Sequence, residues 1–301
     1  MALYQSVGAA ETANKLALSP RSVYRRRRRL ETKHGTVLLG PQSPVTKVVG
    51  HPQRLSLDIK DGTVLIGSDA HYWPGKASTA HRAFVRLCHT FDPSVVIMNG
   101  DAFDGAKLSR FPSTDWNHQP TVAEELGAVQ KRLRELTDAT PNASHIWTFG
   151  NHDQRFESRL TNKVPEFENI EGFSLTDHFP DWRPCFSVWI NDDVVVKHRF
   201  KGGTHAGHNN TLNAGKSIVT GHLHSLKITP YSDYNGTRWG VDTGTLADPD
   251  GPQFTYAEDN PKNHRSGFVV LTFKDGKMLD PEMVRVWDTE HVCFRGELIK
   301  V

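Results

Sequence analysis

The sequence predicts an α/β fold, because three runs of aliphatic and β-branched residues alternate with two stretches of helical periodicity. The expected strands lie at residues 64–66, 95–98 and 145–149. The expected helices lie between them, at residues 79–91 and 121–137. Strands and helices that alternate in this way form parallel βαβ units, which place functional groups at the carboxyl ends of their strands.

The rest of the main domain is predicted to consist mainly of strands. Residues 55–59 alternate as a strand before the first βα unit, and six more strands are expected at residues 186–190, 194–198, 218–220, 238–243, 267–273 and 283–287. Two Asp-Gly pairs, Asp61-Gly62 and Asp275-Gly276, predict tight hairpin turns.

The amino-terminal residues form a separate basic segment. Eight basic against two acidic residues give residues 1–34 a charge of +6, whereas the remaining residues carry −4. Two short helices are expected at residues 9–16 and 21–31, with Ser19 as N-cap and Pro20 as first residue of the second. We therefore divide the chain into this helical segment (1–34), a linker rich in Gly and Pro (35–54) and a main domain (55–301). The aromatic-rich residues 154–186 are a candidate substrate cap.

Composition excludes several classes of protein. No apolar run approaches the ~20 residues of a membrane-spanning helix, and the first residues lack the pattern of a secretory signal. The three cysteines, Cys88, Cys185 and Cys293, are far apart and odd in number, which argues against a disulfide framework. We therefore expect a cytoplasmic protein without a membrane partner.

Five short polar motifs follow predicted strands. They are Asp69-Ala70-His71, Gly100-Asp101-Ala102-Phe103-Asp104, Gly150-Asn151-His152-Asp153, the single His198, and Gly221-His222-Leu223-His224. Their carboxylate, amide and imidazole groups could hold two divalent cations, with Asp101 as the shared anionic ligand between them. The alternatives are that Asp69 and Asp101 cap helices, that Asn151 is a turn residue, and that His205 or His208 replaces His198 as a ligand.

These motifs, over about residues 62–247, resemble those of the calcineurin-like metallophosphoesterases. The resemblance implies two packed mixed β-sheets flanked by helices, with a first metal ion held by Asp69, His71, Asp101 and His224. It implies a second metal ion held by Asp101, Asn151, His198 and His222. It also implies that His152 is the general acid or stabilises phosphate charge, and that Asp104 holds the His152 imidazole and raises its pKa. The imidazole-rich ligand set favours Mn²⁺, with Fe²⁺, Zn²⁺, Ni²⁺ or Co²⁺ as alternatives.

The resemblance implies hydrolysis of phosphodiesters by in-line attack of a hydroxide that bridges the two metal ions. Two departures point away from the protein phosphatases of the family and toward its nuclease and phosphodiesterase branches. The third motif ends in Asp153 where phosphatases have Glu, and Gly105 stands where they carry an arginine. Together with Gly244-Thr245-Leu246, the pattern is similar to that of phage-encoded members. Arg199, His205 and His208 are candidate ligands of the substrate phosphate.

The basic segment resembles the helix-turn-helix segments of resolvases and phage regulators. Its arginines would then contact DNA phosphates: Arg21, Arg25, Arg26, Arg27, Arg28 and Arg29. A solvated helix and an arm for self-association into a homo-oligomer are the alternatives. The sequence thus predicts a DNA-directed phosphodiesterase or nuclease. The rivals are a phosphodiesterase of cyclic nucleotides or nucleotides, and a DNA-binding regulator with a vestigial site, against which the complete ligand set argues.

Overall fold

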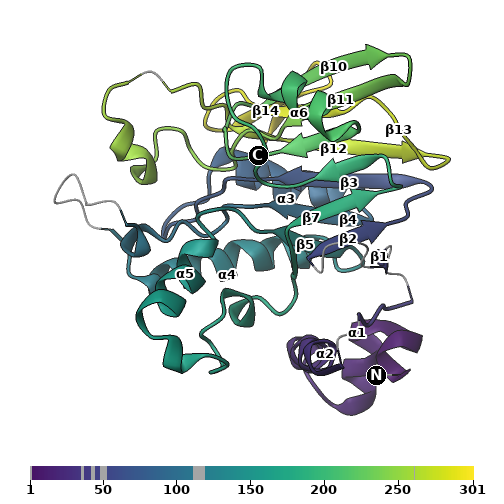
Figure 1. Ribbon diagram of the computed structural model, residues 1–301, viewed down its shortest axis with the longest axis vertical. Helices are drawn as coiled ribbons and strands as arrows, with labels where there is room; N and C mark the ends of the chain where they lie inside the picture. Colours follow the sequence, from purple (N-terminus) through teal and green to yellow (C-terminus); the bar gives the residue numbers. More distant parts are fainter. Residues whose placement is uncertain (1, 35–36, 42–44, 48–52, 111–118, 261) are drawn as a thin grey trace.

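Two β-sheets pack face to face in the main domain, and helices cover their outer faces (Figure 1). The coordinates are a computed structural model, which describes residues 2–34, 37–41, 45–47, 53–110, 119–260 and 262–301. Both sheets contain parallel and antiparallel pairs. The predicted fold class, an α/β fold with two packed mixed sheets flanked by helices, is confirmed.

The larger sheet has nine strands and contains the predicted βαβ units. Its parallel part is linked by two helices, α3 (Thr79–Phe91) and α4 (Val122–Ala139). Ser78 caps α3, and Thr121 and Glu124 form a capping box on α4. The main strand order is β16 (Glu297–Lys300), β15 (His291–Phe294), β14 (Glu282–Val286), β12 (Gly267–Lys274), β3 (Gly62–Gly67), β4 (Val95–Asn99), β5 (Ser144–Thr148) and β6 (Arg183–Cys185), with β13 (Lys277–Met278) paired to β12.

The smaller sheet has seven strands and is covered by one helix, α6 (Ala206–Ala214), which packs on its β9–β11 side. The strand order is β1 (Val45–Lys47), β2 (Arg54–Leu57), β7 (Ser187–Ile190), β8 (Val194–Val196), β9 (Ser217–Thr220), β11 (Gly236–Asp242) and β10 (Lys227–Asp233).

Alternating side chains of the central strands build two separate cores. In β3, Val64 and Ile66 join the cluster between the sheets, whereas Leu65 joins the cluster under α3 and α4. Because both faces of β3 are covered, its sequence is a continuous apolar run rather than an alternating pattern. This double burial holds the carboxyl ends of the central strands in place.

One of the two predicted hairpins is wrong. Asp61-Gly62 does not connect paired strands, because β2 pairs with β7 in the smaller sheet while β3 lies in the larger one. Asp275-Gly276 does form a hairpin between β12 and β13, and both residues have the positive φ (50° and 78°) that such a turn requires. The strands β1, β6, β10, β13, β15 and β16 were not predicted.

The basic segment is helical, as expected from its sequence. It consists of α1 (Ala2–Leu16), which is interrupted at Gly8 by a φ of 78°, and α2 (Pro20–His34). Ser19 accepts a hydrogen bond from the backbone N–H of Ser22 (3.2 Å), as an N-cap does. In Figure 1 these two helices lie at one end of the molecule, outside both sheets. Within the linker, residues 35–36, 42–44 and 48–52 lie outside the described residues, and the linker boundaries stay predictions from the sequence.

Helix α2 is docked on the main domain by its charged side chains. Arg28 donates hydrogen bonds to the carbonyl oxygens of three residues in the 154–186 segment, Thr176, Phe179 (2.8 Å) and Trp182. Glu31 accepts a hydrogen bond from Arg183 (2.7 Å). The segment that receives Arg28 contains α5 (Gln154–Lys163), η2 (Pro165–Phe167) and η3 (Leu175–His178).

The five consecutive arginines therefore have different surroundings. Arg27 donates to the hydroxyl of Tyr4 (3.0 Å) and Arg28 is docked, so neither guanidinium is free for DNA in this arrangement. Arg25 and Arg29 are exposed but both pair with Glu171 (3.4 and 2.6 Å). Among the residues that the structure describes, no helix is both long and apolar enough to cross a membrane.

We expect the substitution Arg28→Leu to release the amino-terminal helices, because it leaves three carbonyl groups without their charged donor. A hydrogen bond to a charged group contributes about 1.5–3 kcal/mol, so the undocked population should rise by more than tenfold. Limited proteolysis within residues 35–54 measures this population. The control Arg26→Leu alters an exposed arginine of the same helix and should leave the cleavage rate within about twofold. Equal cleavage of both variants would contradict the anchoring role.

Candidate metal centre

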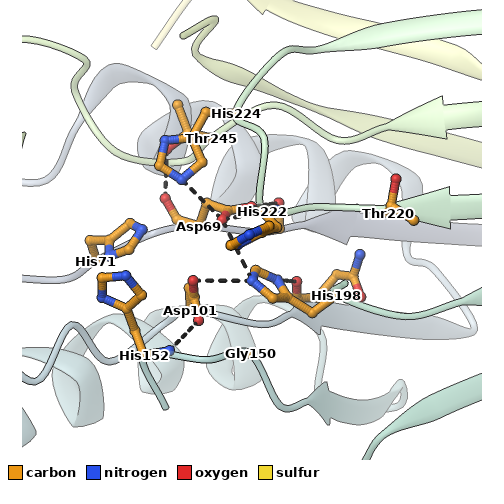
Figure 2. A network of polar contacts seen from close by, with 12 residues as sticks. Asp69, His71, Asp101, Gly150, His152, His198, Thr220, His222, His224 and Thr245 are labelled. Atoms are coloured by element: carbon orange, nitrogen blue, oxygen red, sulfur yellow. Dashed lines mark hydrogen bonds and ion pairs between the residues drawn. The ribbon is translucent and has the colours of Figure 1, made fainter. Parts of the chain in front are cut away.

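The five motifs converge where the carboxyl ends of strands from both sheets meet. Asp69, Asp101, His198 and His222 each lie two residues beyond the end of a strand, β3, β4, β8 and β9 respectively. Backbone hydrogen bonds tie the loops together, from Asp69 N–H to Gly100 O (2.9 Å) and from Gly221 N–H to His198 O (3.0 Å). Figure 2 shows His71 and His152 on one side of the two carboxylates and His198 and His222 on the other.

Five of these residues have an unusual, left-handed backbone conformation. A positive φ between 41° and 72° occurs at Asp69, His71, Asp101, His222 and His224. Residues other than glycine seldom adopt this left-handed conformation, and it costs of order 1–3 kcal/mol each. Neither Asp69 nor Asp101 caps a helix in the described structure, since the sharp turns aim both carboxylates at the other strand ends instead.

One cluster consists of Asp69, His71 and His224, whose ligand atoms lie within 4.8 Å of one another. The Asp69 carboxylate is 3.0 Å from Nε2 of His224 and accepts a hydrogen bond from the backbone N–H of His222 (2.9 Å). Nδ1 of His71 lies 3.0 Å from Oδ1 of Asp104 and donates to it. With its proton held on Nδ1, His71 presents the lone pair of Nε2 to the cluster.

A second cluster consists of Asp101, His198 and His222. Nδ1 of His198 donates to the carbonyl oxygen of Asn99 (2.8 Å), which leaves Nε2 as its free ligand atom. This Nε2 lies 3.0 Å from Oδ2 of Asp101. Oδ1 of Asp101 accepts from the backbone N–H of His152 (2.8 Å).

Three buried polar atoms in and beside the clusters have no hydrogen-bond partner among the described residues. They are Nε2 of His71, Nε2 of His198 and Oδ1 of Asn151. Unpartnered buried polar atoms are costly, and all three belong to residues predicted as ligands from the sequence. Imidazole nitrogen and carboxylate or amide oxygen are the donors that borderline divalent cations take. The residues present therefore fit two such cations.

The charges of the two clusters are strongly coupled. Burial opposes the charge of Asp69, but His224 and His198 outweigh it and lower the pKa of Asp69 to about 2. Burial also opposes protonation of His198, but Asp101 and Asp69 outweigh it and raise the pKa of His198 to about 10. For His71 and His222 burial prevails, and their pKa values fall below the usual range. In the absence of cations, a proton on His198 thus compensates the two carboxylates.

Asp104 links the metal centre to His152. Its Oδ1 accepts from Nδ1 of His71 (3.0 Å) and from Nδ1 of His152 (2.8 Å), so one carboxylate orients both rings. Burial opposes the charge on His152, but the hydrogen bond to Asp104 and the charge of Asp101 outweigh it and raise the pKa of His152. The arrangement has the geometry expected for the predicted pair of His152 and Asp104. It also includes Arg155, which contacts both residues but belongs to none of the five motifs.

Asp153 holds the loops that carry the ligands. Its carboxylate accepts hydrogen bonds from the backbone N–H groups of Asp101 (2.8 Å), Phe103 (3.0 Å) and Gly150 (2.8 Å) and from the indole of Trp147 (3.1 Å). Gly150 is needed for this close approach, since a Cβ there would lie 2.0 Å from Oδ1 of Asp101. Asp153 of the third motif therefore fixes the backbone conformation of the second motif, residues 100–104.

Two residues at the site come from a part of the chain without a motif. The ring of Phe254 lies against those of His71 and His224 (5.5 and 5.4 Å between centroids). Nδ1 of His264 lies 3.4 Å from Nδ1 of His224. Phe254 lies in the 3₁₀ helix η4 (Pro252–Ala257) and His264 in the loop before β12. Both follow the last motif by at least 30 residues, and no spacing in the sequence connects them to it.

The three predicted substrate ligands lie outside both clusters. Arg199 is exposed and reaches Gln154, the first residue of α5 (3.4 Å). His205 precedes α6 and His208 lies within it, where its ring contacts Tyr231. Both histidines are exposed, and His198 rather than either of them joins the metal-ligand cluster.

Residues 62–239, more than half of the chain, match the calcineurin-like phosphoesterase family. The chain belongs to this family. It is therefore a metal-dependent phosphoester hydrolase, and the two clusters correspond to the dinuclear site that the family implies. The identity of the metal is not fixed by the family.

The solved structures that the chain matches are distant in sequence. They include YfcE, a phosphoesterase from E. coli (16% identity, 73% of this chain and 97% of that chain, TM-score 0.35). A protein serine/threonine phosphatase from Saccharomyces cerevisiae, with similarity to human phosphatase PP5, covers 90% of this chain and 91% of its own (12% identity, TM-score 0.39). A dimetal phosphatase from Danio rerio covers 75% and 95% (10% identity, TM-score 0.34). No curated protein matches the chain in sequence.

We expect the metal-free protein to release about one proton per molecule when it binds divalent cations near pH 7, because a cation displaces the proton on His198. The apparent affinity for the cation should rise about tenfold per pH unit as long as His198 is protonated in the metal-free protein. It should level off above the pKa of His198, which is about 10. Isothermal titration in buffers of different ionisation enthalpy measures the proton release. His198→Asn should abolish it and the exposed control His205→Asn should not. Proton-neutral binding by the unmodified protein would show that His198 is not the compensating charge.

Proposed function

We propose that the protein is a phosphodiesterase that acts on DNA. The observation that carries this proposal is the pairing of two clusters, each with one buried carboxylate and two imidazoles, beside the Asp104–His152 pair. Asp153 and Gly105, which depart from the protein phosphatases of the family, support a diester rather than a phosphoprotein substrate. The phage-type character, the cytoplasmic location and self-association stay predictions from the sequence.

In this proposal the first cation is held by Asp69, His71, Asp101 and His224. The second is held by Asp101, Asn151, His198 and His222. Two bound cations supply a water nucleophile at neutral pH and withdraw charge from the phosphate. We propose Mn²⁺, because the imidazoles are borderline donors that Mg²⁺ does not favour.

Residues of the chain itself orient the general acid and transfer the proton to the leaving group. Asp104 holds Nδ1 of His152, so Nε2, which is paired with the Arg155 guanidinium (3.1 Å) in the free protein, is the nitrogen that can meet the substrate. A proton at this Nε2 can pass to the oxygen of the leaving group as its bond to phosphorus breaks. Asp104 stabilises the charged ring during this step, as the raised pKa of His152 indicates.

We propose that the basic segment, residues 1–34, binds DNA. Arg21, Arg25, Arg26 and Arg29 are exposed on α2 and could neutralise phosphates, whereas the main domain has a net negative charge. One observation favours the alternative of a small-molecule phosphodiesterase. Arg27 and Arg28 are engaged within the protein, and Glu171 partly neutralises Arg25 and Arg29.

We expect Asp101→Ala to abolish both metal binding and hydrolysis of bis-p-nitrophenyl phosphate, because it removes the ligand shared by the two cations. His152→Ala should keep both metal ions and lose about 10²–10⁴-fold in kcat, the usual contribution of a general acid. Elemental analysis and steady-state kinetics, after chelation and reloading with Mn²⁺ or Mg²⁺, measure these effects. His205→Ala serves as the control outside the clusters. Loss of metal ions from the His152→Ala variant would show that His152 is a metal ligand and not the general acid.

We expect replacement of Arg21, Arg25, Arg26 and Arg29 by Gln to weaken binding of duplex DNA while Arg28 keeps the helix docked. Each lost phosphate contact should lower the slope of log affinity against log salt by about 0.9. Fluorescence anisotropy over a salt series measures both effects. The double variant Arg86→Gln and Lys131→Gln alters exposed cations on α3 and α4 and is the control. An unchanged slope in the α2 variant would favour the small-molecule alternative.

A further inference from the structure

Helix α5 carries three cations on one side: Arg155, Arg159 and Lys163. They are spaced by four residues, so their side chains follow one another along a single face. The helix begins directly after the third motif, with Arg155 two residues beyond Asp153. Arg159 and Lys163 are exposed, and neither forms an ion pair with any residue that the structure describes. We call these three residues the α5 cationic face.

Arg155 places the first of these cations at the catalytic histidine. Its guanidinium donates to the carbonyl oxygen of Asp104 (2.9 Å) and to Nε2 of His152 (3.1 Å). It also lies 4.0 Å from the Asp104 carboxylate, and its side chain is 22% exposed. Gly105 makes room for it, because a Cβ at Gly105 would lie 3.2 Å from both Cβ and Cδ of Arg155. A guanidinium in this position can form two parallel hydrogen bonds with a phosphate.

The acidic residue of the same helix does not neutralise this face. Glu157 accepts a hydrogen bond from Ser174 (2.5 Å) on the side of α5 toward the docked helix α2. Phe156 and Leu160 pack into the core between these two sides. The α5 cationic face therefore remains a line of positive charge that leads away from the metal centre.

We propose that the α5 cationic face binds the polynucleotide strand on one side of the reacting phosphodiester. Arg155 binds oxygens of the reacting phosphate, and Arg159 and Lys163 bind the phosphates that follow it. Eight residues of helix separate Arg155 from Lys163, a distance of about 12 Å, which a ligand with one phosphate cannot span. The inference rests on the proposed function and specifies how that site would select a polymer over a small diester.

The strand contact is tested by binding without turnover. Arg159→Gln combined with Lys163→Gln should weaken binding of a labelled single-stranded 20-mer, measured by fluorescence anisotropy in the presence of a chelator. Loss of two contacts to a single strand should lower the log–log salt slope by about 1.4. Arg86→Gln combined with Lys131→Gln is the charge-matched control and should change neither quantity. A duplex of the same sequence, measured in parallel, shows which form of the strand this face accepts.

The role of Arg155 is tested by turnover. Arg155→Gln should lower kcat/KM about 10²-fold on both bis-p-nitrophenyl phosphate and the oligonucleotide, and Arg155→Lys should restore part of it. Unchanged metal content and thermal melting distinguish this loss from a structural defect. The Arg159 and Lys163 double variant should instead lower the ratio of oligonucleotide to small-diester kcat/KM about tenfold.

The outcomes separate the two proposals. If the unmodified protein hydrolyses diesters but the double variant keeps the same salt slope and the same substrate ratio as the control, the α5 cationic face is not a strand site. If Arg155→Gln loses no activity, Arg155 does not bind the reacting phosphate. If the unmodified protein hydrolyses no diester, the proposed function is wrong, whereas a changed salt slope would still identify the face as a polyanion site.

Discussion

The burial of two neighbouring carboxylates is the constraint on which the rest of the site depends. Asp69 and Asp101 are almost completely buried, and Asp101 opposes the charge of Asp69. Such a pair is stable only when positive charge and hydrogen bonds surround it. Backbone N–H groups, His224 and the protonated His198 supply these in the metal-free chain. Divalent cations compensate the negative charge of the two carboxylates more strongly than these groups do. For this reason the carboxylate pair that needs positive charge is also the site that binds metal.

The fold supports this arrangement at a local cost. Five of the seven proposed ligands occupy the left-handed backbone region, and each such turn is unfavourable by itself. The turns persist because the surrounding bonds are strong and numerous. Asp153 receives four N–H donors, and Thr245 donates to the carbonyl oxygen of Asp69 (2.6 Å). The packed sheets hold the strand ends rigidly, so the strain is balanced by the stability of the whole domain rather than by the site.

The sequence predicted what is local and not what depends on distant contacts. The strands β3, β4 and β5 can be recognised in the sequence, because strands that are buried on both faces appear as continuous apolar runs. The first three motifs directly follow these runs. The Asp61-Gly62 turn was misread because the partner of β2 is β7, about 130 residues away. Phe254 and His264 carry no motif and reach the site only through tertiary packing. Arg155 lies two residues beyond the third motif, but its contact with His152 depends on the turn into α5, which the sequence does not show. The docking of Arg28 is equally invisible in the sequence, since its partners are carbonyl groups, which every residue has.

The arginine run shows how composition alone can mislead about a binding surface. Successive residues of a helix are about 100° apart, so five consecutive arginines point in all directions and cannot contact one partner together. In α2, Arg27 and Arg28 turn toward the protein, while Arg25 and Arg29 share Glu171. On α5, three cations four residues apart lie on one face; Arg155 pairs with Asp104 (4.0 Å), whereas Arg159 and Lys163 have no acidic partner among the described residues. Arg21, Arg25 and Arg29 of α2 have the same four-residue spacing, but Glu171 pairs with Arg25 and Arg29. Acidic partners as well as spacing therefore decide how much positive charge each helix offers to a strand of phosphates.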